Sequence, residues 1–127
     1  MMVRRWSILA LMGGGLLLLA VSTPAQQGVI CPEIGLRQMN AKGIENLTIS
    51  TTAVALTVPA AALMAVAKVE DQPIRYRSDG TAPTSTAGVK AAAADTLILC
   101  GRAILSNFKS IRQGATDAAL SVEYYGR

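Results

Sequence analysis

The chain has 127 residues, with 12 basic and 8 acidic side chains, two cysteines and no histidine. The absence of histidine excludes Ser/His/Asp and Cys/His catalytic arrangements and zinc sites with histidine ligands. The basic residues are spread along the chain and few aromatic residues follow residue 25, so the sequence has neither the basic stripe nor the stacking platform of a nucleic-acid-binding protein. We therefore predict no nucleic-acid partner.

The first 25 residues have the organisation of an export signal. Arg4 and Arg5 give a positive start, Trp6–Val21 is an uncharged apolar run expected to be helical, and the small residues that a signal peptidase reads end at Ala25. We expect cleavage after Ala25. A retained membrane anchor is the alternative, but the run is shorter than the roughly 20 residues that span a bilayer. Removal of the segment leaves about 100 residues, enough for one domain.

Residues 26–46 are predicted to be an N-terminal extension. Met39 within it is a candidate start if translation begins downstream of the apolar run. In an exported chain, Cys31 of the extension and Cys100 reach an oxidising compartment and are a candidate disulfide. The alternative is that Cys100 is a small buried core residue and Cys31 is free, because sequence position does not give the required Cα separation.

From residue 47 onward the chain alternates apolar and small polar residues in short runs, as strands do. Leu47–Ser50 and Ala53–Val58 predict one or two strands, which end at Pro59. Ala61–Glu70 mixes helix-favouring residues with a strand pattern. We predict a strand here because Pro59 is not followed by a helix-capping residue.

The middle of the domain is predicted to contain one clear strand and a long loop. In Ile74–Arg77 the apolar residues share one strand face and the arginines the other. Ser78-Asp79-Gly80 has the composition of a turn, and Thr81–Ala87 that of a loop. Val89–Ala94 fits either a poor strand or a helical turn.

The last part of the chain contains the strongest strand pattern. Thr96–Cys100 is predicted to be a strand, and Ala118–Tyr125 alternates most clearly. Arg102–Arg112 is either one helix or a short helix followed by a strand from Phe108. About seven short strands predict an all-β fold, a small antiparallel β-sandwich or barrel over residues 47–127.

Two segments carry a resemblance to a known group of proteins. Residues 73–84 read PIRYRSDGTAPT, and residues 108–112 read FKSIR. The chain resembles, over residues 47–125, small tailed-phage and prophage virion-associated proteins, which share a P-I-R-x-R strand, a D-G-T-x-P-T turn and an F-x-x-I-R strand. The resemblance implies a compact all-β structural protein of head or tail. Such proteins assemble in the cytoplasm and normally lack an export signal, in which this chain differs from them.

Four side chains are candidate partner-binding residues. Arg75 and Arg77 share one strand face and Asp79 follows in the turn, so the planar donor forks of the arginines are suited to a carboxylate or an acidic loop. The alternative is that the arginines are the solvated face of an antiparallel strand and that Asp79 and Gly80 only form the turn. Tyr125 is either an aromatic anchor for a partner or an edge-packing side chain.

No catalytic, metal or cofactor site is predicted, because spaced thiolates, a phosphate-binding glycine loop and a convincing carboxylate pair are missing. The resemblance implies a non-enzymatic structural or assembly protein located in the virion. The export segment and the cysteines favour an exported periplasmic or cell-surface interaction module instead. Both hypotheses predict protein partners and a homo-oligomer, because the edge strands of a small sandwich must be covered or paired. Membrane contact is expected only through an uncleaved N-terminal segment.

Overall fold

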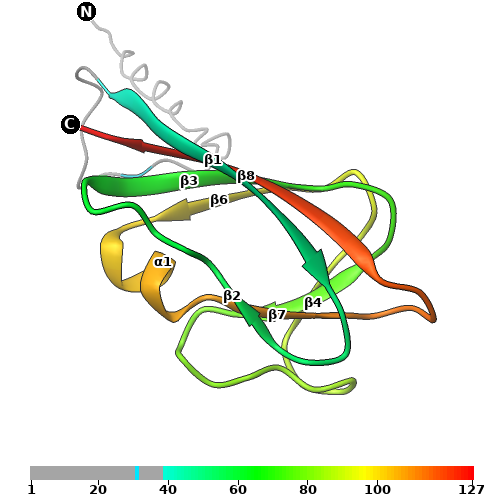
Figure 1. Cartoon of the computed structure of the whole chain (residues 1–127). Helices are drawn as coiled ribbons and strands as arrows, with labels where there is room; N and C mark the ends of the chain where they lie inside the picture. Colours follow the sequence, from blue (N-terminus) through cyan, green and yellow to red (C-terminus); the bar gives the residue numbers. More distant parts are fainter. Residues whose placement is uncertain (1–30, 32–38) are drawn as a thin grey trace, which may run out of the picture. The chain divides into compact units, whose positions relative to one another are not determined.

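A computed structural model describes Cys31 and residues 39–127, and the predicted export segment lies outside these residues. The described part is all-β, with two antiparallel four-stranded sheets and one short helix, α1 (Arg102–Asn107) (Figure 1). Sheet A has the order β1 (Asn40–Ile49), β8 (Ala118–Gly126), β3 (Ala62–Val69), β6 (Thr96–Cys100). Sheet B has the order β2 (Val54–Ala55), β7 (Lys109–Arg112), β4 (Ile74–Arg77), β5 (Val89–Ala91). The predicted all-β class is confirmed, in a sandwich-like arrangement.

One hydrophobic core takes side chains from both sheets. Its largest fully buried side chains include Tyr124 from β8, Ile74 from β4 and Phe108, which precedes β7. Small neighbours make room for the largest of them, because Tyr124 pairs with Gly43 of β1 on one side and Ala65 of β3 on the other. The alanines of this chain therefore complement the shape of a few large rings, as close packing requires.

Strand β8 shows why the alternating sequence predicts the fold well. Its residues are alternately buried and partly exposed from Ala118 to Gly126. The buried set packs in the core, and the other set lies on the outward face of sheet A. Strands β3, β4 and β6 also lie where the alternation predicts them. The burial of one face fixes the register, because a slip by one residue would move every apolar side chain outward.

Strand β1 begins at Asn40, inside the segment predicted to be an extension. A bulge between Ala41 and Gly43 places an additional residue, Lys42, opposite β8. The bulge breaks the period of two that identifies a strand, so the alternation becomes regular only after it. The domain therefore starts before residue 47, and seven residues of the predicted extension, 40–46, belong to the sheet.

Three further segments differ from the expectation or settle an open alternative. Residues 53–58 pair with β7 over only two positions, because the partly buried Leu56 and Val58 turn toward the core instead of extending the sheet. In the segment 102–112, the short helix followed by a strand is the alternative that the structure adopts. Residues 89–94 include a three-residue edge strand, β5.

Ser110 on β7 has a buried hydroxyl that lacks a hydrogen-bond partner within the described residues. The residue pairs with Tyr76 on β4 and with Val54 on β2, so its side chain shares the core-facing side of sheet B with theirs. A buried polar group without a partner costs about 1–3 kcal/mol. The hydroxyl therefore weakens the fold instead of stabilising it.

We expect Ser110→Ala to leave the free energy of unfolding unchanged or to raise it by about 1 kcal/mol, since it removes an unpaired polar group. Urea denaturation measures the change. Ser121→Ala, on the outward face of β8, is the matched control and should change the free energy by less than about 0.5 kcal/mol. A clear loss of stability in Ser110→Ala alone would mean that the hydroxyl has a stabilising partner.

Candidate functional site

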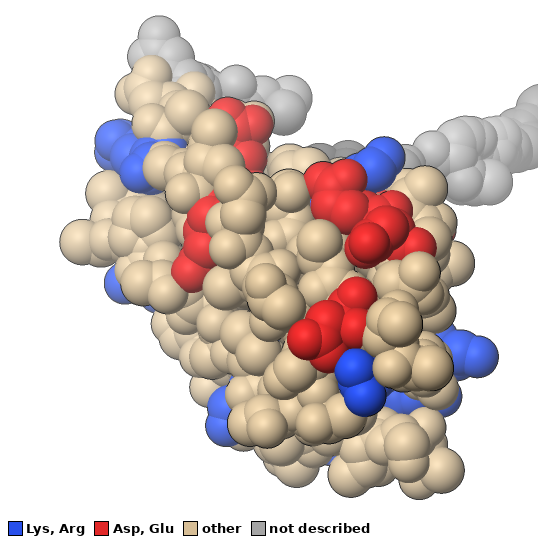
Figure 2. All heavy atoms as spheres, turned by 45° about the vertical axis from the view of Figure 1, so that its right-hand side comes forward, with Lys and Arg blue, Asp and Glu red and all other residues tan. Residues whose placement is uncertain are grey.

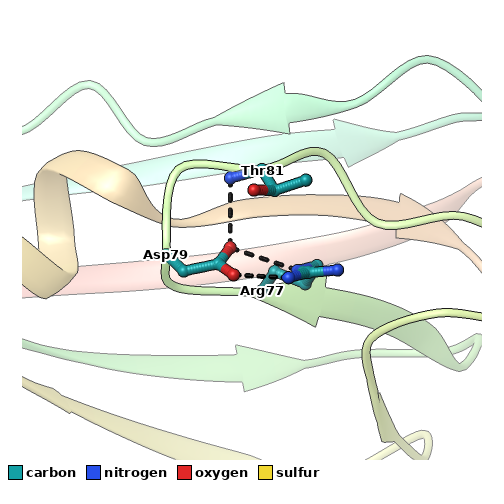
Figure 3. Close-up of polar contacts among 3 residues, drawn as sticks. All are labelled: Arg77, Asp79 and Thr81. Atoms are coloured by element: carbon teal, nitrogen blue, oxygen red, sulfur yellow. Dashed lines mark hydrogen bonds and ion pairs between the residues drawn. The ribbon is translucent and has the colours of Figure 1, made fainter.

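The turn after β4 is held by a three-residue polar cluster. Arg77 donates from Nε to Oδ1 of Asp79 at 3.1 Å, and its second nitrogen, Nη2, contacts Oδ2 (Figure 3). The backbone N–H of Thr81 donates to the same Oδ1 at 3.0 Å. Gly80 adopts a positive φ of 88° and donates from its backbone N–H to the carbonyl of Asn107 at 3.1 Å. The turn is thus closed on itself and tied to the end of α1.

This cluster leaves little free charge for a partner. Hydrogen bonds from Arg77 and from the backbone N–H of Thr81 lower the pKa of Asp79 to about 2. The same pair raises the pKa of the Arg77 guanidinium. Both side chains are solvent-accessible, 34% and 52% exposed, but each already satisfies the other. The geometry favours turn formation, the alternative given for these residues, over capture of an acidic partner.

Arg75 belongs to a separate contact. Its Nε donates to Oε1 of Gln113 at 2.7 Å, and its Nη1 donates to the carbonyl of Gly88 at 2.9 Å. The side chain lies on the outward face of sheet B, as predicted, but the loop over residues 81–88 folds back onto it, with Pro83 buried. The structure therefore separates Arg75 from the Arg77–Asp79 pair.

We expect Gly88→Ala to lower the free energy of unfolding by about 1–3 kcal/mol, because Gly88 has a φ of +126° and an added Cβ would lie 3.0 Å from the carbonyl oxygen of Tyr76 and 3.1 Å from Cβ of Pro83. Thermal unfolding measures the loss. The control is Gly114→Ala, whose Cβ would meet only Oε1 of Gln72, at 3.6 Å. Equal stabilities of the two variants would mean that the loop is not clamped in this way.

Tyr125 lies on the outward face of sheet A. Its hydroxyl donates to Oε2 of Glu123 at 2.7 Å, and this hydrogen bond raises the pKa of Tyr125. In the register it lies beside Ala41 of β1 and Met64 of β3. The part-buried residue lies on the central strand β8, between β1 and β3, so it is one component of a wider surface.

That surface contains an apolar row which the sequence did not single out. Ile44, Val66 and Ile98 lie in register with Glu123, one residue from each of the four strands of sheet A. Ile44 is 71% and Ile98 40% exposed. A shallow hollow of about 250 Å³ lies between Ile44, Val66 and Lys68. β1, β3 and β6 each supply one apolar side chain, and β8 places Glu123 between Ile44 and Val66. Only the register between strands, which the sequence does not display, brings these residues into one row.

Glu45 of β1 and Tyr124 of β8 form a second polar pair, which the sequence did not predict. Glu45 also connects β1 to the segment that contains Thr57. Tyr124 donates from its hydroxyl to Oε2 of Glu45 at 2.6 Å, and the backbone N–H of Thr57 donates to both carboxylate oxygens, at 3.0 and 3.2 Å. Burial acts to raise the pKa of Glu45, but these hydrogen bonds outweigh it and the pKa is lowered. Burial and the Glu45 carboxylate raise the pKa of Tyr124. The pair lines a hollow of about 250 Å³ beside Pro59.

The ionised carboxylate of Glu45 stabilises the fold through these hydrogen bonds and is not a free acid. Because its folded-state pKa lies below the ordinary value of 4.5, its contribution is present above that pH and is lost as the pH falls through the folded-state value. No signal in the sequence pointed to it, since Glu45 precedes the predicted domain boundary and its partner Tyr124 is 79 residues away.

We expect Glu45→Gln to lower the free energy of unfolding by about 1 kcal/mol at pH 7, because the charge-assisted hydrogen bonds are lost. The deficit should shrink as the pH falls below the ordinary pKa of 4.5 and through the lower folded-state value, where the wild-type carboxylate becomes protonated. Urea denaturation across this range measures it. The exposed Glu70, replaced by Gln, is the control. A deficit independent of pH would contradict an ionised role for Glu45.

The two cysteines are joined. Cys31 and Cys100 form a disulfide across 69 positions of sequence, with their Cα atoms 5.3 Å apart. Cys100 ends β6 and pairs with Met64 of β3, on the outward side of sheet A. Closing a loop of this length contributes about 4 kcal/mol in the chain-entropy model. The bridge is therefore the alternative that the structure adopts.

Two further carboxylates, Asp95 and Asp117, secure loops between strands. Figure 2 shows acidic side chains in separate groups on the face that it displays, with basic side chains mostly at its margins. Asp95 accepts from the backbone N–H of Ala92 at 2.8 Å, and Asp117 pairs with Arg112 at 2.7 Å. In the described part of the chain, no group of three or more potential ligands is placed to hold a metal ion.

Comparison of the chain with protein-family models, with curated protein sequences and with solved structures finds no match. Among residues 39–127, no helix combines the length and the apolar character that crossing a bilayer requires.

Proposed function

We propose that this chain is a non-enzymatic protein-binding module that works outside the reducing cytoplasm, in the periplasm or at the cell surface. The observation that carries the proposal is the disulfide between Cys31 and Cys100. Structural disulfides persist in oxidising compartments and are rare in the cytosol. The first 25 residues have a positive start, an apolar run and small residues at the cleavage position, and this organisation supports the same location.

The arrangement of polar groups supports binding over catalysis. The carboxylates of Asp79 and Glu45 are occupied by hydrogen bonds, and the hydroxyl of Ser110 is buried without a base beside it in the described structure. An accessible surface with binding character is the outward face of sheet A, where apolar side chains lie beside Lys68 and Glu123. Exposed apolar rows rimmed by charge are typical of protein–protein contacts.

A structural role in a phage or phage-derived particle, as a decoration or tail-associated protein, is the second candidate. The segments that carry the resemblance, residues 73–84 and 108–112, include β4 and β7, which pair with each other in sheet B. The resembling motif is thus a contiguous part of one sheet and not two separate fragments. This observation favours a shared structural unit, and the disulfide favours export.

The N-terminus and thiol state of the protein in its producing cell distinguish the two candidates. If the chain is exported, intact-mass measurement should show that it begins at Gln26, with both cysteines oxidised, because signal peptidase acts after Ala25 and oxidation follows translocation. Purified Cys31→Ser has one free thiol, that of Cys100, and serves as the reference for counting free thiols.

A chain that begins at Met1 and has two free thiols would contradict export and favour assembly in the cytoplasm. A start at Met39 would do the same, because it removes Cys31 and with it the bridge. Turnover in a broad hydrolase panel, abolished by one polar substitution on the described surface, would contradict the non-enzymatic role.

A further inference from the structure

Strand β1 is the long free edge of this fold. Sheet A ends in β1 and β6, and sheet B ends in β2 and β5. β1 has 10 residues, whereas the other three edge strands have 5, 2 and 3. It lies beside β8 at the margin of its sheet (Figure 1). An edge strand presents unpaired backbone N–H and C=O groups, and a long flat edge is a template for another strand.

The features that discourage pairing are confined to the start of β1. The bulge at Lys42 twists the strand and places a lysine there, and both features blunt an edge. The following segment, Ile44–Ile49, has the sequence IENLTI, without proline, glycine or lysine. Its only charged side chain, Glu45, points inward and is already hydrogen-bonded. Over the described ranges, the ladder of β1 runs to β8 alone, so its other side is bare.

We propose that β1 pairs antiparallel with β1 of a second copy of this chain, so that sheet A continues across a twofold axis into the partner. The proposal deepens the function above by naming the edge through which the binding module associates. Each copy contributes the segment Ile44–Thr48, and Asn46 lies on the axis. Ile44 then lies opposite the partner subunit's Thr48, and Glu45 opposite the partner subunit's Leu47.

The charges and the bulge select this register. Opposite residues in an antiparallel pair share a face, so a symmetric pairing must be centred on one residue. Centring on Glu45 would place two carboxylates opposite each other, which is destabilising, and would bring the bulge into the ladder. Centring on Leu47 would shift Ile44 beyond the end of the partner's strand. The register centred on Asn46 pairs the five residues Ile44–Thr48, gives the exposed Ile44 a partner, keeps the bulge out of the ladder and opposes no like charges.

The segment is complementary to itself, which favours a second copy over an unrelated peptide. The Asn46 amide carries donors and acceptors, so two such amides on the axis are able to bond each other. Ile44, 71% exposed in one copy, gains the methyl group of the partner subunit's Thr48 as cover. The outward apolar row through Ile44, Val66 and Ile98 would then continue toward the second copy, as in an isologous interface.

Asn46→Lys tests the interface, because it places two ammonium groups opposite each other on the axis while the side chain stays exposed in the monomer. Light scattering and sedimentation of the whole purified chain, disulfide intact, should show a dimer for the wild type. Asn46→Lys should raise the dissociation constant about tenfold or more. Ile98→Lys, on the same face but on β6 at the opposite edge of sheet A, is the matched control and should remain dimeric. Circular dichroism confirms that both variants fold.

Cysteine crosslinking tests the register. Asn46→Cys should form an intermolecular disulfide under mild oxidation, because the two thiols meet on the axis. Thr48→Cys should not, because its two copies lie roughly 13 Å apart along the paired strands. Non-reducing mass measurement separates the two results, and Thr48→Cys controls for random oxidation and exchange with the native bridge.

A wild-type chain that stays monomeric at high concentration would overturn the proposal, as would a dimer dissociated by Ile98→Lys and not by Asn46→Lys. The second outcome would assign the contact to the outward face of sheet A instead. Equal crosslinking at positions 46 and 48 would also overturn it. None of these results depends on the N-terminus or thiol state in the producing cell. A failure of the dimer proposal can therefore be distinguished from a failure of the export proposal.

Discussion

Strand β8 lies between β1 and β3, and the core is arranged around its inward-facing side chains. Leu120, Val122 and Tyr124 are all buried, and each meets a smaller or complementary neighbour across the ladder. Tyr124 constrains its neighbours most, because its ring fits beside the small residues Gly43 and Ala65 and its hydroxyl donates to Glu45. Burial of that ring thus fixes the register of three strands and ties β1 to the segment containing Thr57.

The charged residues of the chain mainly secure its connections. Asp79 closes the turn after β4, Arg75 holds the following loop, and Arg102 donates to the carbonyls of Pro59 and Ala60 at 2.6 and 2.8 Å, where the chain enters β3. An arginine or carboxylate engaged in this way is poorly suited to recognise a partner. Within the described residues, sheet A instead carries the exposed apolar side chains of Ile44 and Ile98, and its edge strand β1 pairs only with β8.

The disulfide is attached to sheet A at Cys100, so the oxidising location that preserves it also bears on the stability of the fold. Much of the core is alanine, which buries little apolar area for each residue, so a covalent constraint on the unfolded chain adds stability where the core is modest. The bridge at Cys100 holds Cys31 at the end of β6, and strand β1 is the opposite edge of the same sheet. In the proposed assembly, the disulfide stabilises each subunit and β1 joins the subunits.

The sequence by itself determined the all-β class and the positions of β3, β4, β6 and β8, because local alternation and turn residues report which face of a strand is buried. It left open whether the cysteines pair and whether residues 102–112 are wholly helical. It did not predict the start of β1, because a bulge interrupts the alternation there. The separation of Arg75 from Asp79, the Glu45–Tyr124 pair and the apolar row on sheet A were decided only by the tertiary structure. Each depends on register or loop path, which brings together residues far apart in sequence and leaves no local pattern.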